Sequence, residues 1–451
     1  MMIGLLSALL VCLAPDEPSH TDAVSRPHVV FVMADDLGPG DIGFSGGTLA
    51  ATPNLDRMAR DGVRFTRYYS AAPICSPSRC GLITGNFPAR LRLTSYLQTR
   101  AGNRACGQAD FLDPRAPSLP RVLHDAGYRT AHFGKWHLGG GRDVTDAPRF
   151  AAYGYDEHAG TWESPEPHPD ITATNAIWSA KDRTKRWDRT AFYVDKTLDF
   201  LARHKDRPCF VNVWLDDPHT PWVPESAAGK GASTAPNLKA VMEEVDRQVG
   251  RLREGLKALG IERKTLLVFT SDNGPLPTLD GRRSGVLRGS KLSLYEGGIR
   301  LPFVAVWPGT IAAGAVDETT VLGAVDVFPT VCKLAGAALP AEARADGEDR
   351  SPALLGSPQP GRARPLFWEY GRNDTSFDYP TVRNGARRGD RSPSLAVLEG
   401  SWKLLVNVDG TGAELYDLST DPAETKDLAS TQPERVARLT KLVLEWRSSL
   451  P

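Results

Sequence analysis

Short apolar runs that end abruptly in polar or glycine-rich residues recur along the chain up to about residue 345. They are rich in β-branched residues and lack the alternation of a half-exposed strand, so they predict strands buried on both faces. The runs are His28–Ala34, Arg129–Phe133, Phe210–Leu215 and Thr265–Thr270. Strands of this kind are typical of a mostly parallel sheet covered by helices.

Helical patterns lie between these runs, at Asn54–Asp61, Leu119–Ala126, Ala191–His204, Lys239–Leu259 and Asp326–Leu334. Because strands and helices alternate, the sequence predicts an α/β domain, which we place at residues 26–345. Ligands in such sheets bind outside the carboxyl ends of the strands. The polar residues that follow the runs are therefore expected to form one site.

The pattern changes after residue 345. Short strand-like segments and a final helical pattern follow, at Pro365–Tyr370, Ser394–Leu398, Trp402–Val408, Ala413–Tyr416 and Gln432–Ser448. These segments predict a small C-terminal α+β subdomain at residues 346–451, with an antiparallel sheet and one helix.

The charge balance excludes some partners. The 451 residues include 54 Lys plus Arg and 54 Asp plus Glu, so the formal net charge is zero. No long-range field then favours nucleic acid or an anionic membrane. An anionic substrate has to be held by local charges.

The N-terminus carries a short apolar run, Ile3–Ala14, which predicts a secretory signal peptide within residues 1–25. The run is too short to span a bilayer, and no other segment reaches the roughly 18 apolar residues that a membrane helix needs. We therefore expect an exported protein, periplasmic or extracellular, without an integral membrane segment.

Six cysteines are present, and Cys12 leaves with the signal peptide if it is cleaved. Cys209 and Cys332 lie in apolar runs and are interpreted as buried thiols. Cys80 and Cys106 are the one pair that we single out to test for a disulfide. The remaining cysteine, Cys75, begins the most specific pattern in the chain.

That pattern is the segment Cys75–Gly85, CSPSRCGLITG. It resembles the signature of the type I sulfatases, Cys-x-Pro-Ser-Arg followed by x-x-Leu-x-Thr-Gly, at every defined position. These arylsulfatase-like enzymes belong to the alkaline phosphatase superfamily, so the resemblance implies an alkaline-phosphatase-like fold. It also implies that a formylglycine-generating enzyme oxidises Cys75 to Cα-formylglycine during export. A hydrated aldehyde has two hydroxyls on one carbon, so one can attack sulfur and the other can lose its proton to expel sulfate.

Two acidic segments predict a metal site. Asp35-Asp36 places two carboxylates side by side, which repel each other unless a cation neutralises them. Asp272-Asn273 closes another strand end in the same way. Oxygen ligands suit Ca²⁺ or Mg²⁺ rather than zinc. The resemblance favours Ca²⁺ over Mg²⁺ and implies these ligands: Asp35, Asp36, Asp272, Asn273 and modified Cys75.

The segment Gly134–Gly139, GKWHLG, resembles the family's second signature. The resemblance implies that Lys135 binds a sulfate oxygen as a compact charge. It also implies that His137 takes the proton from the aldehyde hydrate. Arg79 lies four residues after Cys75, one turn along if a helix starts there, and is expected to orient the hydrate.

Two further residues complete the expected site. His219 follows a buried strand and is similar to the family histidine that protonates the leaving oxygen. Lys291 matches the second family lysine, a further ligand of the sulfate. Two lysines, one arginine and a metal ion then form the electrostatic clamp that a dianionic transition state needs.

We therefore predict a hydrolase of sulfate monoesters, acting on a sulfated carbohydrate or another sulfated small molecule. Two alternatives stay open. Related enzymes on this fold use formylglycine to hydrolyse phosphonates or phosphodiesters, although a Gly-Lys-Trp-His segment with a second lysine suits sulfate better. A catalytically dead glycan-binding protein is the other alternative, but none of the catalytic or metal positions that match the family is substituted.

Overall fold

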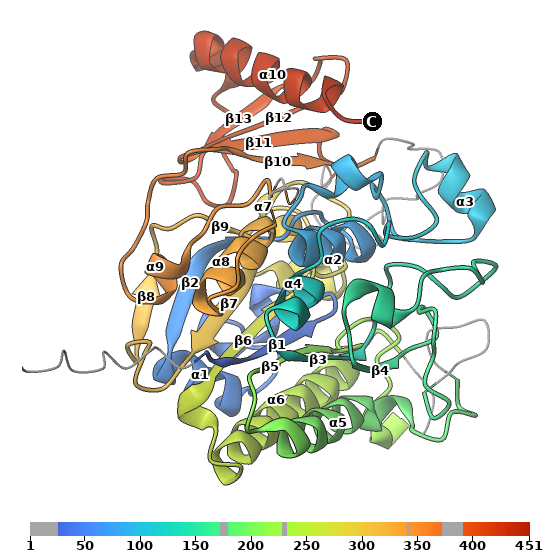
Figure 1. Cartoon of the computed structure of the whole chain (residues 1–451). Coiled ribbons are helices and arrows are strands. Elements are labelled where there is room, and N and C mark those ends of the chain that lie inside the picture. Colours follow the sequence, from blue (N-terminus) through green and yellow to red (C-terminus); the bar gives the residue numbers. More distant parts are fainter. Residues whose placement is uncertain (1–25, 172–178, 228–231, 341–342, 344, 372–390) are drawn as a thin grey trace, which may run out of the picture.

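A large sheet with helices on both faces makes up most of the protein, and a smaller sheet with one helix lies against one side of it (Figure 1). The computed structural model describes residues 26–171, 179–227, 232–340, 343, 345–371 and 391–451. The predicted signal peptide, residues 1–25, lies outside the described residues. None of the helices in the described ranges has the length and apolar character needed to cross a bilayer.

Nine of the described strands form the large sheet, in the order β4-β3-β5-β1-β6-β7-β2-β8 with β9 beside β2. They are β1 His28–Ala34, β2 Val63–Tyr69, β3 Arg129–Gly134, β4 Glu157–Gly160, β5 Cys209–Trp214, β6 Thr265–Ser271, β7 Arg300–Val306, β8 Ala315–Asp317 and β9 Leu322–Gly323. The central strands β3, β5, β1 and β6 pair in parallel, as expected. Strand β7 runs antiparallel to both β6 and β2, so the sheet is mixed but mostly parallel.

The central strand β1 shows why these runs are continuously apolar. Val29 and Phe31 pack into the hydrophobic cluster on one face of the sheet, whereas Val30 and Val32 pack into the cluster on the other face. Helices α1, α5 and α6 cover the second face, and α2, α4 and α8 cover the first (Figure 1). A strand buried on both faces cannot show polar alternation.

The helices predicted from the sequence all form, with ends that differ by a few residues. The described helices are α1 Pro53–Asp61, α2 Cys75–Thr84, α3 Arg100–Ala105, α4 Leu119–Asp125, α5 Arg189–His204, α6 Ala235–Ala258, α7 Glu296–Ile299, α8 Val327–Leu334, α9 Ser351–Leu354 and α10 Pro433–Ser448.

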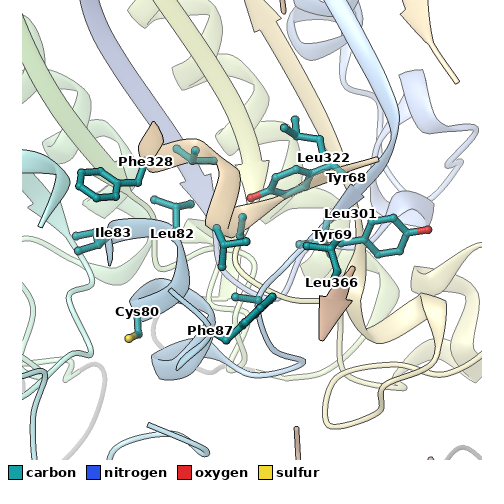
Figure 2. Close-up of a cluster of buried hydrophobic side chains, with 14 of the residues drawn as sticks. Tyr68, Tyr69, Cys80, Leu82, Ile83, Phe87, Leu301, Leu322, Phe328 and Leu366 are labelled. Atoms are coloured by element: carbon teal, nitrogen blue, oxygen red, sulfur yellow. The ribbon is translucent and has the colours of Figure 1, made fainter. Parts of the chain in front are cut away.

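Helix α2 is buried on every side, and all of its ten residues are buried. Pro77 lies in its first turn, where a missing N–H costs nothing, and Gly85 ends it with a φ of 67°. Figure 2 shows Leu82 and Ile83 of this helix beside Phe328 of α8, with the side chains of Tyr68 and Leu301 nearby. This packing fixes the helix that begins at Cys75.

The C-terminal part forms the antiparallel sheet and helix predicted for it. The strands β10 Leu366–Glu369, β11 Leu395–Glu399, β12 Trp402–Val406 and β13 Glu414–Asp417 lie in sequence order, and α10 packs on β11 and β12. The ring of Trp446 stacks on Phe367 at 4.9 Å between centroids. The domain boundary at residues 345 and 346 stays a prediction.

The cysteines settle one open question. Cys80 and Cys106 are both buried and are not bonded to each other, so the one disulfide singled out for testing does not form. Each thiol has another contact: Thr84 is beside Cys80, and the Gln98 amide donates to the Cys106 sulfur at 3.5 Å. Cys209 and Cys332 are buried thiols, as expected.

Candidate active site

Four strand ends bring the predicted site residues together. Asp35 follows β1, Lys135 follows β3, Asp272 follows β6, and His219 lies beyond β5. The backbone pairing continues past the strands: Asp272 N–H donates to Ala34 at 3.1 Å, and Lys135 N–H donates to Trp214 at 2.9 Å. This continued pairing holds the functional side chains in register at the carboxyl ends of the central strands.

Cys75 occupies the first position of α2, at the positive end of the helix dipole. Its Sγ atom lies 3.6 Å from Lys135 Nζ, 3.5 Å from Lys291 Nζ and 3.7 Å from Asp35 Oδ1. Burial raises the pKa of the Cys75 thiol to about 12, although both ammonium groups oppose that shift. The unmodified side chain is therefore a neutral thiol at neutral pH.

Three cations neutralise the buried carboxylates around Cys75. Lys135 Nζ lies 2.6 Å from Asp35, and Lys291 Nζ lies 2.6 Å from Asp36. Arg79 donates to Asp35 at 3.1 Å and to Asp272 at 2.7 Å. Burial alone would raise the pKa of Asp35, but Lys135, His219, Arg79 and Lys291 together hold it well below its usual range.

The donor set fits a hard cation. Asp36 Oδ2 and Asn273 Oδ1 are buried and have no hydrogen-bond partner within the described chain, although Asn273 Nδ2 donates to Asp36 Oδ1 at 2.7 Å. Buried oxygens without a donor are costly unless something binds them. The ligand atoms of Asp35, Asp36, Cys75 and His219 all lie within 4.8 Å of one another, so the His219 ring joins the expected group.

Asp272 is oriented differently from the other acidic residues. Its Oδ1 accepts from the backbone N–H groups of Asp36 at 3.2 Å and Asn273 at 2.8 Å, and its Oδ2 accepts from Arg79. Burial and the nearby Asp35 carboxylate raise the pKa of Asp272 to about 6. Asp272 therefore shapes the loop that presents Asp36 and Asn273, in addition to facing the site.

His219 is the most exposed of the predicted site residues, with 17% of its side chain accessible. Its Nδ1 lies 2.6 Å from the Thr220 carbonyl oxygen, so Nδ1 carries a proton, and its Nε2 lies 3.7 Å from Asp36 Oδ2. Arg186, which is buried, donates to the carbonyl oxygens of Asp216 at 2.9 Å and His219 at 3.2 Å. The site therefore reaches solvent beside a histidine whose backbone is fixed.

His137 lies in the same region but has its own partners. Its Nε2 lies 3.2 Å from the Leu97 carbonyl oxygen and 3.4 Å from Glu163 Oε1. Sequence reasoning missed Glu163, because nothing in the local pattern distinguishes it from other acidic loop residues. Its burial, with 2% of the residue exposed, becomes visible only in the fold.

All of the predicted site residues except His137 are joined by direct contacts around Cys75, Asp35 and Asp36. Asp36, His137 and Leu292, beside Lys291, have positive φ values of 63°, 53° and 74°. Such left-handed conformations in residues other than glycine persist where the surrounding structure enforces them, and they cluster at functional sites.

A mostly parallel α/β sheet with a buried cysteine, paired carboxylates and cationic side chains at the carboxyl ends of its strands defines a hydrolase of the alkaline phosphatase superfamily. A family model described as Sulfatase matches residues 27–337, and one described as N-sulphoglucosamine sulphohydrolase, C-terminal, matches residues 290–447. The chain belongs to the type I sulfatase family, and it is a sulfuric ester hydrolase.

Similar proteins agree with this assignment. Arylsulfatase A of Homo sapiens is 32% identical, with 94% of this chain and 88% of that protein covered. The N-acetylgalactosamine-6-O-sulfatase of Bacteroides thetaiotaomicron is 28% identical, with 93% and 92% covered. The crystal structure of Ps i-CgsB matches with a TM-score of 0.75 and 26% identity, covering 93% of this chain and 92% of that one.

Proposed function

We propose that this sulfatase removes sulfate from a sulfated carbohydrate by means of a hydrated formylglycine made from Cys75 and a bound divalent cation. The observation that supports the proposal most directly is the set of charged groups around the sulfur atom of Cys75. Cys75 Sγ lies between two lysine ammonium groups, at 3.5 and 3.6 Å, and an aspartate oxygen at 3.7 Å. A nucleophile here would meet sulfate where positive charge is already in place.

The modification supplies what the cysteine side chain lacks. The Cys75 thiol has a pKa of about 12 because of its burial, so it offers almost no thiolate at neutral pH. An aldehyde hydrate at this position has one hydroxyl to attack sulfur and a second whose deprotonation expels the sulfate. Lys135 and Lys291 would hold the sulfate oxygens, and Arg79 would orient the hydrate.

The cation would be held by oxygen atoms of Asp35, Asp36, Asp272 and Asn273 together with the modified residue 75. An all-oxygen set suits Ca²⁺, which we propose, and admits Mg²⁺. The ion would supply positive charge that favours the deprotonated nucleophile. It would also take over neutralisation of Asp35 and Asp36 that Lys135 and Lys291 now share.

Two histidines would move the protons. We assign His137 the proton that the hydrate loses as sulfate departs. We assign His219 the proton that the departing sugar oxygen gains, because its Nε2 lies beside Asp36 and its side chain is the most exposed in the group. Alkoxides of sugars leave poorly, so a proton donor matters more here than for an aryl leaving group.

The carbohydrate assignment draws support from the names of relatives, which include an N-acetylgalactosamine-6-O-sulfatase. Turnover of a panel of sulfated mono- and oligosaccharides would test it directly. An aryl sulfate and a phosphate diester should be assayed in parallel. Faster turnover of the diester would overturn the choice of sulfate.

The nucleophile is tested by Cys75→Ala, which should abolish sulfate release and leave the fold unchanged by circular dichroism. Peptide mass spectrometry of the active wild-type protein should show the mass of formylglycine at residue 75. A Cys75→Ala variant with normal turnover, or an active wild type with intact cysteine, would contradict the proposal.

We also propose that the protein is exported and that a formylglycine-generating enzyme modifies it on the way. The mass of the mature N-terminus from a periplasmic or culture fraction tests the export. Active protein that stays in the cytoplasm with Met1 retained would refute it.

A further inference from the structure

Glu163 contacts His137 twice. The backbone N–H of His137 donates to the Glu163 carbonyl oxygen at 3.0 Å, and the Glu163 carboxylate faces the His137 ring at 3.4 Å. Arg142 fixes that carboxylate by donating to the same Oε1 atom at 2.6 Å. The carboxylate is therefore oriented before any substrate binds.

The ring of His137 has a defined tautomer. Its Nε2 faces the Leu97 carbonyl oxygen at 3.2 Å and a carboxylate, and both of these groups only accept hydrogen bonds. Nε2 must therefore carry the proton, and Nδ1 keeps its lone pair. Nδ1 is buried and has no hydrogen-bond partner in the described part of the chain.

Leu97 ties this histidine to the nucleophile. The backbone N–H of Leu97 donates to Ser76 Oγ at 2.9 Å, and Ser76 is the neighbour of Cys75. Two residues before His137, Lys135 reaches the Cys75 sulfur. The tautomer and the nucleophile are thus set by one connected set of contacts.

The charges around His137 oppose a proton on its ring. Burial, together with the charges of Lys135, Arg142 and Arg79, lowers the pKa of His137 to about 3, and Glu163 is the group that opposes this shift. The charge of Glu163 is kept at neutral pH: burial would raise its pKa, but His137, Lys135 and Arg142 lower it to about 2. Glu163 is therefore the counter-charge for an imidazolium.

We propose that Glu163 is a positioning residue for His137, which fixes the ring with Nε2 protonated and stabilises the imidazolium formed when Nδ1 accepts a proton during sulfate release. The inference rests on the proposed function. In that step the second hydroxyl of residue 75 gives its proton to Nδ1 of His137. The electron pair of the broken O–H bond forms the C=O bond of the aldehyde. The bond between the same carbon and the sulfate oxygen breaks, and its electron pair leaves with the sulfate. An acidic residue plays the same part beside the histidine of serine hydrolases.

The test compares Glu163→Gln with Glu166→Gln. Glu166 lies on the same loop and accepts from the Phe150 N–H at 3.1 Å, and among the described residues it forms no hydrogen bond or ion pair with His137. We expect Glu163→Gln to lower kcat by about 10- to 100-fold, in the range of a lost proton-transfer contribution, with little change in KM. Because release is the slowed step, intact mass spectrometry should show a sulfate ester accumulating on residue 75. Glu166→Gln should behave as wild type.

A second measurement does not depend on the modification. In protein whose Cys75 is unmodified, ¹⁵N chemical shifts of His137, assigned by their loss in His137→Gln, should show the tautomer with Nε2 protonated. A wild-type ring protonated at Nδ1 would overturn the inference. So would a Glu163→Gln variant with normal turnover, or one with a raised KM and no sulfate ester. A wild type lacking formylglycine would instead count against the proposed function.

Discussion

At the scale of single residues, the site consists of buried carboxylates paired with buried cationic side chains. Three carboxylates and three cations lie within it, namely Asp35, Asp36, Asp272, Arg79, Lys135 and Lys291. A buried charge is tolerated only when it is paired, so each partner limits what the others can do. An anionic substrate, or the cation that we propose, would have to enter this set by replacing existing ion pairs.

Chelation tests the proposed cation. Removing it with EDTA should abolish turnover, and added Ca²⁺ should restore more activity than Mg²⁺. The melting temperature should also fall, because a ligand that binds only the folded state stabilises it by mass action. Full activity in protein shown by elemental analysis to be metal-free would contradict the assignment.

Removing one lysine tests the proposed binding of sulfate by Lys135 and Lys291. Lys291→Ala should lower kcat/KM by about 10²- to 10³-fold, the range found when one donor to developing charge is deleted. Lys239, whose side chain is 59% exposed and lies 3.8 Å from Glu243, offers the matched control. A Lys291→Ala variant no more impaired than Lys239→Ala on an aryl sulfate would show that Lys291 is not a substrate ligand.

At the scale of elements, the end of β3 is held by a close backbone approach. Gly134 has a φ of 115°, and a Cβ atom there would lie 1.8 Å from the Trp214 carbonyl oxygen of β5. The next residue, Lys135, donates its N–H to that same oxygen at 2.9 Å. The strand therefore positions Lys135 only if residue 134 has no side chain.

Gly134→Ala should destabilise the fold by about 2–5 kcal/mol, since backbone strain and overpacking each cost a few kcal/mol. Gly336→Ala is the control, because Gly336 also has a positive φ, 63°, but a Cβ there would meet no atom within 4 Å. Urea unfolding followed by circular dichroism measures both. Equal losses would mean that φ alone, and not the contact with β5, sets the cost.

Sequence patterns predicted the central parallel strands of the large sheet. Strands β1, β3, β5 and β6 follow from continuous apolar runs, and the residues after them follow from the rule that site residues gather at carboxyl ends. Strand β2 was missed because Arg64, Thr66 and Arg67 interrupt its apolar positions at the side of the sheet. Strand β7, Arg300–Val306, was not predicted either, and its antiparallel direction depends on long-range pairing.

The residues of the candidate site also fall into those that the sequence could predict and those that it could not. Residues at strand ends or in a dense motif could be chosen from the sequence. Glu163 and Arg186 could not, because their roles come from contacts across loops that no periodicity encodes. Whether Cys80 and Cys106 pair with each other likewise depends on where distant segments pack, and they do not.

At the scale of the whole molecule, one buried ion triad joins the two sheets. Lys403 of β12 lies 2.8 Å from Glu296 of α7 and 2.9 Å from Glu424, and all three side chains are inaccessible or nearly so. The Glu424 carboxylate also accepts from the Glu296 backbone N–H at 2.7 Å. Lys291 lies a few residues before this junction, so the small sheet supports the loop that carries it.

Lys403→Met should cost about 3–5 kcal/mol, because it leaves two carboxylates buried without their shared cation. The free energy of unfolding in urea measures this loss. Lys441→Met, at a side chain that is 75% exposed, should change stability little. Similar values for the two variants would show that the triad does not hold the sheets together.

The triad also makes stability depend on pH. Burial and Glu296 raise the pKa of Glu424 to about 7 from 4.5, although Lys403 opposes the shift. The folded state therefore keeps a proton that the unfolded state loses. The stability contributed by this proton is fully present below pH 4.5 and is lost as the pH rises through about 7.

Glu424→Gln should remove that dependence. Melting temperatures measured between pH 4.5 and 7.5 should fall less steeply with rising pH in the variant than in wild type. Parallel curves for the two proteins would mean that Glu424 does not titrate in this range.

The complete burial of α2 has a consequence for how active protein is made. If Cys75 is oxidised as proposed, the oxidising enzyme has to reach it in the nascent chain, before the sheets close around it. Folding then competes with the oxidation of Cys75. A molecule that folds first keeps an unmodified Cys75 thiol and stays inactive. The specific activity of a preparation would therefore report the order of two events during synthesis, and late addition of the maturation enzyme to folded protein would not rescue it.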